Sequence, residues 1–288
     1  TLLDKIKSEG EKFVLLNSFL RQFKINSATI NALENKGFIK ICNIEIDRSR
    51  INQEYTSLAT RNELDLNLTM EQQSSVLSIQ NAIDLNQHQA FLLYGITGSG
   101  KTLVYLHSIS HTLNAKKSVL ILVPEISLTP QLIDRFERAF PEQVAVFHSK
   151  MSMGERYDSW NSVFQQKRKV VLGVRSAIFA PLKNLGLIII DEEHEPSYKQ
   201  ESPAPRYNAR DTALIRAKYE DAVIVLGSAT PSLESYYNSK EGKYKLLELK
   251  NRADNAKMPI IKTIDLKDAR RQSQLLGTMT ISLLEKIE

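Results

Sequence analysis

The sequence has few of the features that would cross-link the chain or carry it into a membrane. It has a single cysteine, Cys42, which excludes an internal disulfide framework and a zinc site built from several cysteines. No apolar run approaches the roughly 20 residues that a helix needs to cross a bilayer, and no signal-peptide pattern is visible. We therefore expect a cytoplasmic protein with no membrane partner.

The composition is that of a globular protein large enough for two domains. The 288 residues are 42% hydrophobic and 25% charged. The net charge of +5 favours a polyanionic partner, although a basic surface without such a partner explains it nearly as well. The chain starts at Thr1 and ends within an amphipathic helical pattern at 283–288, so we expect it to be excised from a longer protein.

A glycine-rich segment, Gly95–Thr102, matches the phosphate-binding motif G-x-x-x-x-G-K-[ST]. The apolar run 91–94 before it predicts a strand, and the spacing of apolar residues over 103–113 predicts a helix. A chance glycine turn is the alternative, but the flanks have the order that the motif needs. Glycines let the backbone approach phosphates, the lysine supplies a charge near the β- and γ-phosphates, and the threonine hydroxyl can bind Mg²⁺. The predicted nucleotide-binding residues are Gly95, Thr97, Gly98, Ser99, Gly100, Lys101 and Thr102.

Strand and helix patterns alternate after this loop. This order predicts an α/β fold with a parallel sheet flanked by helices, as in P-loop (RecA-like) NTPases. The predicted strands are 119–123, 144–147, 169–174, 185–190, 223–226 and 244–249, and the predicted helices are 129–140, 153–166 and 211–219. Ligands in such sheets bind at the carboxyl ends of the strands, which is where polar motifs follow the apolar runs here.

Residues 1–65 are expected to form a separate small domain. A helix with one apolar face is predicted around Phe13–Phe23. A second helix is predicted over 28–35, with Ser27 at its N-cap and Gly37 at its C-cap, and a strand is predicted over 38–42. This order fits a winged-helix-like domain and equally a helical cap on the main domain. The polar stretch 48–66 is predicted to be a linker.

A helix start is predicted at Leu68–Gln72. Thr69 can cap this helix, and Gln72 stands at the position that completes a capping box. The Gln72 amide could instead face the adenine of a bound nucleotide; the spacing alone favours the cap.

The strand 185–190 runs into Asp191, Glu192, Glu193 and His194. An acidic pair at the end of a buried strand is the Walker B arrangement, in which Asp191 holds Mg²⁺ and Glu192 orients and deprotonates the attacking water. A surface acidic turn is the alternative, and the upstream phosphate-binding loop weakens it.

A third polar segment, Gly227–Thr230, follows the strand 223–226. The hydroxyls of Ser228 and Thr230 could bond to the acidic strand end and to His194, which would give a connection that senses the nucleotide state. By itself this tetrapeptide is weak support.

Together these motifs resemble those of superfamily 2 helicases of the D-E-x-H type. Within them, residues 94–102, 122–129, 174–177, 191–194 and 227–232 resemble the primosomal protein N′ family of bacterial replication-restart DNA helicases. The resemblance covers residue 68 to the end. It implies an ATP-dependent, Mg²⁺-dependent 3′-to-5′ DNA helicase that acts at stalled forks, with replication-restart proteins and single-strand-binding protein as partners. Two departures are Leu103, where relatives have an acidic residue, and Glu195, where Asp is commoner.

The resemblance also implies which residues face DNA. Segments 124–129 and 174–177 correspond to DNA-facing segments, and residues 198–210 correspond to an aromatic-rich loop that couples DNA to hydrolysis. Aromatic rings stack on bases and cationic side chains neutralise phosphates, whereas composition alone would favour an ordinary surface loop. The predicted nucleic-acid contacts are Arg175, Lys199, Arg206, Tyr207 and Arg210.

We expect residues 66–250 to be the first helicase lobe and 251–288 the connection toward a second. The family's γ-phosphate arginines and its paired-cysteine zinc element are expected beyond residue 288, so no zinc site is expected in this monomeric chain. Because arginine fingers are worth roughly 10³–10⁵ in rate, the chain alone should bind ATP–Mg²⁺ weakly, hydrolyse it poorly and not unwind DNA. The alternatives are another superfamily 2 translocase, such as a recombination or restriction motor, and a catalytically silent P-loop DNA-binding module.

Overall fold

The computed structural model describes residues 27–39, 63–253, 263–272 and 274–287. The chain divides into two compact units, Thr1–Asp47 and Arg48–Glu288. The domain boundary at residue 65 stays a prediction. Within the described ranges, no helix combines the length and the apolar character needed to cross a membrane.

The described part of the first unit is one helix, α3 (Ser27–Asn35). The helix ends at Gly37, which has a left-handed φ of +74°, and the N–H of Phe38 donates to the carbonyl of Leu33 at 3.0 Å. This confirms Gly37 as the predicted C-cap, because glycine adopts positive φ without a steric penalty. The predicted helix around Phe13–Phe23 and most of the predicted strand 38–42 lie outside the described residues, so the winged-helix interpretation stays a prediction.

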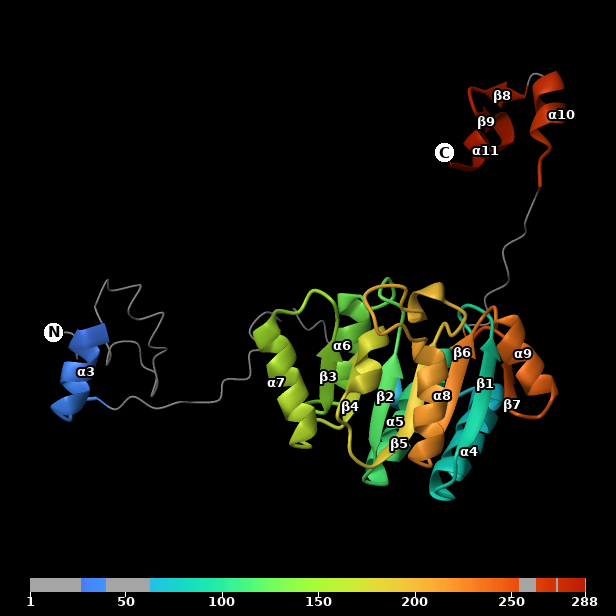
Figure 1. Ribbon diagram of the computed structural model, residues 1–288. Coiled ribbons are helices and arrows are strands. Elements are labelled where there is room, and N and C mark those ends of the chain that lie inside the picture. The colour runs from blue at the N-terminus through green and yellow to red at the C-terminus, as the bar shows by residue number, and fades with distance from the viewer. Residues whose placement is uncertain (1–26, 40–62, 254–262, 273, 288) are drawn as a thin grey trace. The chain divides into compact units, whose positions relative to one another are not determined.

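The second unit is built on a seven-stranded sheet in which every neighbouring pair is parallel (Figure 1). The strand order is β3-β4-β2-β5-β6-β1-β7. The strands are β1 (Gln89–Gly95), β2 (Ser118–Leu122), β3 (Val144–Phe147), β4 (Val170–Gly173), β5 (Leu185–Asp191), β6 (Val223–Ser228) and β7 (Lys245–Leu249). Each predicted strand of this domain is present, with ends shifted by no more than two residues.

Helices cover both faces of the sheet, which explains why strands such as β2 and β5 are apolar almost throughout, whereas the edge strand β7 carries exposed charged residues. Alternate residues along a strand point to opposite faces of the sheet. Phe91 and Leu93, for example, pack against one set of helices, and Leu92 packs against the second set. The first set is α4 (Met70–Asp84), α5 (Lys101–Asn114) and α6 (Pro130–Ala139). The second set is α7 (Met153–Phe164) and α8 (Ala209–Tyr219).

Some elements differ from the prediction. The end of the predicted linker is a short 3₁₀ helix, Glu63–Asp65, in which Glu63 accepts a hydrogen bond from Nε of Arg135 on α6 at 2.7 Å. Helix α9 (Leu233–Lys240) was not predicted, since its sequence is polar and has no clear apolar period. Its start is nevertheless capped by Ser232, whose hydroxyl accepts from the N–H of Ser235.

The C-terminal residues form a small group of elements: α10 (Leu266–Arg271), an antiparallel pair of β8 (Leu275–Leu276) and β9 (Met279–Thr280), and α11 (Ile281–Ile287). Helix α11 agrees with the amphipathic pattern predicted at the chain end. The role of 251–288 as a connection toward another domain stays a prediction.

The register of the central strands brings distant parts of the sequence to one edge. Asp191 at the end of β5 pairs with Gly227 on β6, and Ser228 pairs with Tyr94 on β1. Gly95 in turn pairs with Leu249 at the end of β7. The three polar motifs therefore share the carboxyl edge of the sheet, as the sequence predicts.

Candidate active site

The phosphate-binding loop joins the end of β1 to the start of α5. Gly98 and Gly100 have φ values of +81° and +80°, which side chains rarely tolerate. Lys101 is the first residue of α5, and its Nζ donates to the carbonyl of Gly95 at 2.9 Å. The first N–H groups of a helix have no intrahelical acceptor and carry partial positive charge, so this loop has the geometry of an anion cradle.

Gln72 lies against this loop. Its Oε1 accepts from the N–H of Thr69 at 2.9 Å, and the hydroxyl of Thr69 accepts from the N–H of Gln72, so the predicted capping box is present. The other end of the amide, Nε2, donates to the carbonyl of Ser99 at 2.8 Å. Gln72 is therefore buried between α4 and the phosphate-binding loop, and a contact with adenine stays a prediction.

Asp191 ends β5 beside the loop, and the buried Tyr105 of α5 donates its hydroxyl to Oδ1 of Asp191 at 2.9 Å. Burial raises the pKa of Asp191, while the hydrogen bond from Tyr105 and the charge of Lys101 act in the opposite direction. Tyr105 was not predicted as part of the site. Its helical spacing marks it only as a core residue.

The side chains present fit a magnesium ion. Mg²⁺ is commonly held by one or two protein oxygens together with substrate phosphates and water. The Thr102 hydroxyl and the Asp191 carboxylate are oxygen ligands of this kind. Nowhere in the described ranges do three or more His, Cys, Asp or Glu side chains gather in a group that could hold a metal by themselves. A nucleotide-dependent magnesium site is the kind that these residues can form.

Glu192 follows Asp191 in an uncommon backbone conformation. Its φ is +45°, a left-handed value that is rare for a residue other than glycine, Asn or Asp. The turn is held by hydrogen bonds from the N–H of Glu193 to the carbonyl of Gly227 and from the N–H of Glu195 to the carbonyl of Glu192. Such conformations cluster at functional sites. The side chain of Glu192 is 32% exposed, so it can meet a water molecule at the edge of the sheet.

His194 connects the acidic turn to the segment after β6. Its Nδ1 lies 2.8 Å from the hydroxyl of Ser228, and its Nε2 lies 3.4 Å from the hydroxyl of Thr230. Ser228 also accepts from the N–H of Thr230 at 2.9 Å. The structure thus contains the predicted contacts of both hydroxyls with His194, while the predicted bond to the acidic strand end and the role as a nucleotide sensor stay predictions.

Glu193 is a site residue that the sequence analysis missed. Its side chain is fully buried and accepts from the N–H and hydroxyl of Ser232 and from the hydroxyl of Ser235. Arg210 completes this set, with its Nη1 3.1 Å from Oε2 of Glu193. The pair ties α8 and α9 to the acidic turn. Because the Arg210 side chain is only 18% exposed and is bound by protein, it differs from the surface contact that we predicted; binding of nucleic acid by Arg210 stays a prediction.

The loop after the acidic turn is anchored by Tyr198 and Arg175. Tyr198 is buried, and its hydroxyl donates to the carbonyls of Leu122 at 3.1 Å and Asp191 at 2.6 Å. Arg175 donates through Nη1 to the carbonyls of Ser197 and Lys199. Arg175, which was predicted to contact nucleic acid, therefore positions the loop that carries Lys199, another predicted contact.

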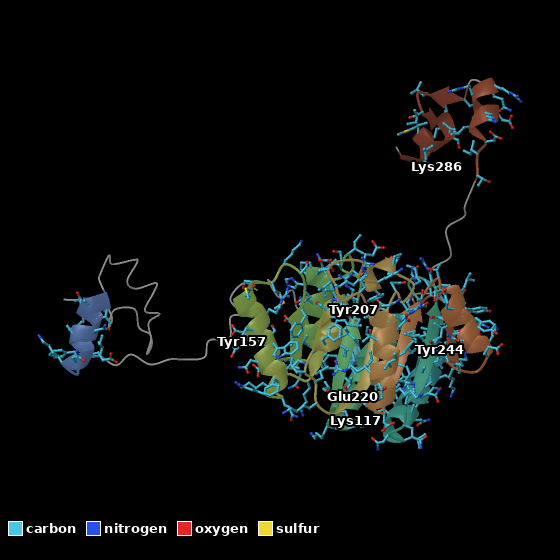
Figure 2. All side chains as sticks on the ribbon, in the orientation of Figure 1. Lys117, Tyr157, Tyr207, Glu220, Tyr244 and Lys286 are labelled. Atoms are coloured by element: carbon cyan, nitrogen blue, oxygen red, sulfur yellow. The ribbon has the colours of Figure 1, made fainter. Side chains whose placement is uncertain are left out.

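The outer part of this loop holds Lys199, Arg206 and Tyr207. Lys199 forms an antiparallel bridge with Asn208, and the ring of Tyr207 packs edge-on against Phe179 with 5.0 Å between centroids. Figure 2 shows Tyr207 toward the carboxyl ends of the strands, whereas Lys117 and Glu220 lie at the opposite end of the sheet. Lys199 and Arg206 are exposed, as a phosphate contact requires.

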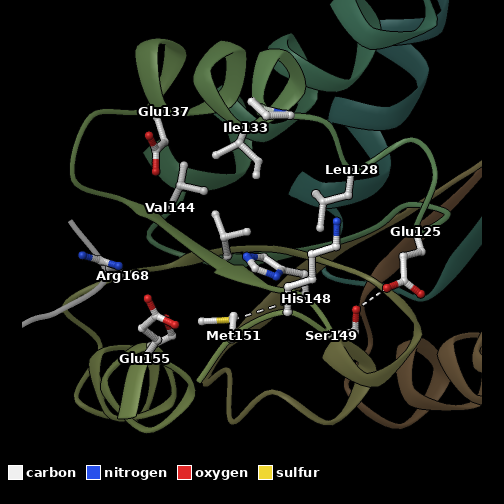
Figure 3. Close-up of a pocket in the computed structure, with 14 residues that line it drawn as sticks. Glu125, Leu128, Ile133, Glu137, Val144, His148, Ser149, Met151, Glu155 and Arg168 are labelled. Carbon is white, nitrogen blue, oxygen red and sulfur yellow. Dashed lines mark hydrogen bonds between the residues drawn. The ribbon is translucent and has the colours of Figure 1, made fainter. Parts of the chain in front are cut away.

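A pocket of about 430 Å³ lies along the edge strand β3, between α6 and α7 (Figure 3). Its wall includes Glu125 and Leu128 from the segment predicted to face DNA. Its lining holds side chains of both charges, with Lys150 and Arg168 as cations and Glu125, Glu137 and Glu155 as carboxylates, so its charge does not point to one class of ligand.

Sequence comparison identifies the family of this chain. Residues 65–233 match the family described as "Type III restriction enzyme, res subunit". The chain belongs to this family. The matched region begins just before α4 and ends at the start of α9, so it contains the phosphate-binding loop, the acidic turn and the segment after β6.

The resemblance to replication-restart helicases is confirmed by curated relatives. The chain is 45% identical over 263 residues to "Replication restart protein PriA" of Bacillus subtilis, a match that covers 91% of this chain and 32% of that protein. The protein of the same name from Chlamydia pneumoniae is 39% identical, with 94% of this chain and 36% of that protein covered. The chain thus spans about a third of the length of these relatives.

Solved structures with similar folds include "Structure of RecG bound to three-way DNA junction", at 22% identity and a TM-score of 0.48, covering 73% of this chain and 27% of that one. "Crystal Structure of DUF1998 helicase MrfA bound to DNA" has 16% identity and a TM-score of 0.45, covering 64% of this chain and 27% of that one. The assignment of the fold as a P-loop NTPase depends on the sheet order and the phosphate-binding loop described above.

Proposed function

We propose that this chain is the ATP-binding lobe of an ATP-dependent, Mg²⁺-dependent DNA helicase that acts in replication restart. One observation carries the proposal: the phosphate-binding loop, the Asp191–Glu192 pair and the Ser228–Thr230 segment meet at one edge of the sheet. The 45% identity to a replication restart protein supports the biological role. The 3′-to-5′ polarity, the preference for forked DNA and the partner proteins follow from the family resemblance.

Each residue has a role that its position supports. The cradle of Gly98–Thr102 binds the phosphates, and Lys101 exchanges the carbonyl of Gly95 for a phosphate oxygen. A bound Mg²⁺, held by Asp191 and Thr102, would neutralise charge on the transferring phosphoryl group. Glu192 orients the attacking water and accepts its proton. His194 transmits the state of this carboxylate to Ser228, because its Nδ1 lies 3.7 Å from Oε2 of Glu192 and 2.8 Å from Ser228.

Nucleic acid would bind across the loops at the same edge. Lys199 and Arg206 are placed to contact phosphates, and Tyr207 to stack on a base if its ring leaves Phe179. A second candidate is a restriction or recombination translocase, which the match to the restriction-enzyme family favours. The motor chemistry would be the same, and only the DNA substrate and the partners would differ.

The test is ATP hydrolysis by the longest natural form of the protein, with and without forked DNA, beside a Glu192→Gln variant. Strong stimulation by forks, lost in the variant, supports a DNA-coupled motor with Glu192 as its base. Equal hydrolysis with and without DNA would point to a P-loop enzyme whose substrate is not nucleic acid. The 288-residue chain alone should hydrolyse ATP slowly and should not unwind DNA.

A further inference from the structure

The backbone beyond β7 runs back along the phosphate-binding loop. The carbonyl of Leu249 accepts from the N–H of Ile96 at 3.4 Å, and Nε of Arg252 donates to the carbonyl of Thr97 at 3.2 Å. The N–H of Ala253 donates to the carbonyl of Gly98 at 3.0 Å. We call residues 249–253 the strap. None of these residues belongs to the phosphate-binding motif or to the acidic turn.

Glu71 anchors the strap to α4. Its Oε2 accepts from the N–H groups of Lys250 at 2.9 Å and Asn251 at 3.3 Å, and its Oε1 accepts from Nδ2 of Asn251 at 2.8 Å. A carboxylate that accepts three hydrogen bonds holds its partners firmly, because charge-assisted bonds are stronger than neutral ones. Glu71 immediately precedes Gln72, so the first turn of α4 holds the strap with one side chain and the phosphate-binding loop with the next.

The strap and Gln72 together occupy three successive carbonyls of the phosphate-binding loop. Thr97 accepts from Arg252, Gly98 from Ala253, and Ser99 from Gln72. In a planar trans peptide the C=O and the N–H of the next residue point in opposite directions. Donors that hold the carbonyls of Thr97 and Ser99 outward therefore turn the N–H groups of Gly98 and Gly100 to the opposite side of the loop, where a phosphate would lie.

We propose that Glu71 and Arg252 are positioning residues for the nucleotide phosphates. Glu71 fixes the turn at Lys250–Asn251, this turn places Arg252 and Ala253 on the loop carbonyls, and the carbonyls set the direction of the anion-binding N–H groups. The ligand class is a nucleoside di- or triphosphate with Mg²⁺. The proposal rests on the nucleotide site of the proposed function and adds that nucleotide binding and order in the strap are linked. Linkage is reciprocal, so a bound nucleotide should hold the strap more firmly.

The matched pair of variants is Arg252→Ala and Lys250→Ala. Each removes one positive charge from the strap, but the Lys250 side chain is 71% exposed and its ion pair is with Glu248, at 3.4 Å, away from the phosphate-binding loop. Lys250→Ala also keeps the backbone N–H that donates to Glu71. A difference between the two variants therefore reports the hydrogen bond to Thr97 and not the loss of charge. Glu71→Ala removes the anchor and serves as a third variant.

The first measurement is the affinity of the 288-residue chain for ADP–Mg²⁺, by calorimetric titration. Arg252→Ala and Glu71→Ala should each bind about threefold to tenfold more weakly than wild type, which is the range expected for one lost hydrogen bond. Lys250→Ala should stay within about twofold. Thermal unfolding without nucleotide identifies a variant that is merely destabilised, and Arg252→Ala should unfold at the wild-type temperature because Arg252 lies outside the core.

The second measurement is amide hydrogen exchange at Ala253 and Asn251, with and without saturating ADP–Mg²⁺. If the strap has only a structural role, its amides would exchange at the same rate with and without ADP–Mg²⁺. We expect ADP to slow amide exchange at Ala253 and Asn251 in wild type and in Lys250→Ala. In Glu71→Ala, ADP should not change the exchange rate at these two amides.

The role of the strap would be overturned if Arg252→Ala and Lys250→Ala bound ADP equally well. It would also be overturned if ADP did not change the exchange rate of the strap amides in wild type. Either result would leave the proposed function intact. If ADP binding depends on Arg252 but forked DNA does not stimulate ATP hydrolysis, the role of the strap in nucleotide binding is supported and the helicase assignment is wrong. If the wild-type chain binds no ADP, both proposals fall together.

Discussion

The hydroxyl of Tyr105 lies 2.9 Å from Oδ1 of Asp191 and donates a hydrogen bond to that carboxylate. Burial, together with the nearby Asp191 charge, holds the pKa of Tyr105 well above its ordinary value, so the phenol remains a donor at any physiological pH. One oxygen of the proposed magnesium-binding carboxylate is thus bound by protein, which leaves the other oxygen for a metal ion or its water.

Tyr105→Phe should shift the pH dependence of hydrolysis. Burial raises the pKa of Asp191 and the Tyr105 hydrogen bond lowers it, so removing the hydroxyl raises it further. Because Mg²⁺ binds the ionised carboxylate, the acid limb of the pH profile for Mg²⁺-dependent ATP hydrolysis should move to higher pH, with little change on the plateau. Tyr219→Phe, on an 85% exposed side chain, is the control. An acid limb at the wild-type position would show that this bond does not control Asp191.

Gly227→Ala should destabilise the protein through Tyr105. A Cβ atom at position 227 would lie 1.7 Å from the hydroxyl of Tyr105 and 2.9 Å from its Cζ, and the buried ring has no room to retreat. We expect a loss of about 1–3 kcal/mol in the free energy of unfolding, measured by urea denaturation. Adding Tyr105→Phe should recover part of it, since the closest atom is then gone. Gly242→Ala is the control: its φ of +75° strains alanine, but its Cβ would meet nothing within 4 Å, so whatever stability it loses should show no coupling to Tyr105→Phe.

Two adjacent glutamates should respond in opposite ways to the same substitution. Glu192→Gln should leave stability near wild type, because the side chain is one-third exposed, but reduce DNA-stimulated hydrolysis by about 10²–10⁴. Glu193→Gln should lower the free energy of unfolding by about 2–3 kcal/mol, because it removes the buried charge that pairs with Arg210. Denaturation and steady-state hydrolysis of both variants provide the comparison. A stable, inactive Glu193→Gln would contradict the structural role that we assign to Glu193.

Gly100→Ala should weaken nucleotide binding through Gln72. Its φ of +80° strains any side chain, and a Cβ there would lie 2.4 Å from Nε2 of Gln72. The amide would have to leave the carbonyl of Ser99. We expect about thirtyfold weaker ADP–Mg²⁺ binding, since the displaced amide and the strained backbone each cost about 1 kcal/mol. Adding Gln72→Ala to Gly100→Ala should then weaken binding little further, because the amide contact is already lost. If the losses of the two single variants add, backbone strain and not Gln72 is responsible for the effect of Gly100→Ala.

The sequence was sufficient for the elements and motifs that depend on local pattern. Apolar runs predicted the strands, and the polar residues after them predicted where the site lies, because parallel strands end at a common edge. The capping box at Thr69 and Gln72 was likewise readable from spacing. These features need no knowledge of how distant side chains meet.

Contacts between distant residues were not predictable. Tyr105, Tyr198 and Glu193 stand in patterns that fit a core helix, a surface loop and an acidic turn, and only the strand register shows their partners. Arg210 was predicted to contact nucleic acid because it lies in the segment that resembles the aromatic-rich loop, whereas in the structure it is bound by the buried carboxylate of Glu193. The strap was not predicted either, because Glu71 and residues 250–252 are far apart in the sequence and several of the contacts between them and the phosphate-binding loop involve backbone groups.

The interleaved strand order has a consequence for synthesis of the protein. The phosphate-binding loop follows β1, but β1 lies between β6 and β7, the last two strands of the sheet to leave the ribosome. A nascent chain therefore carries its complete glycine motif long before the strands that flank it exist, and such long-range parallel pairing forms slowly. ATP cannot act as a template for early folding of this domain. The ability to bind nucleotide arises late, when the chain through residue 249 is available, and a truncation before that residue would remove it even though every motif residue remains.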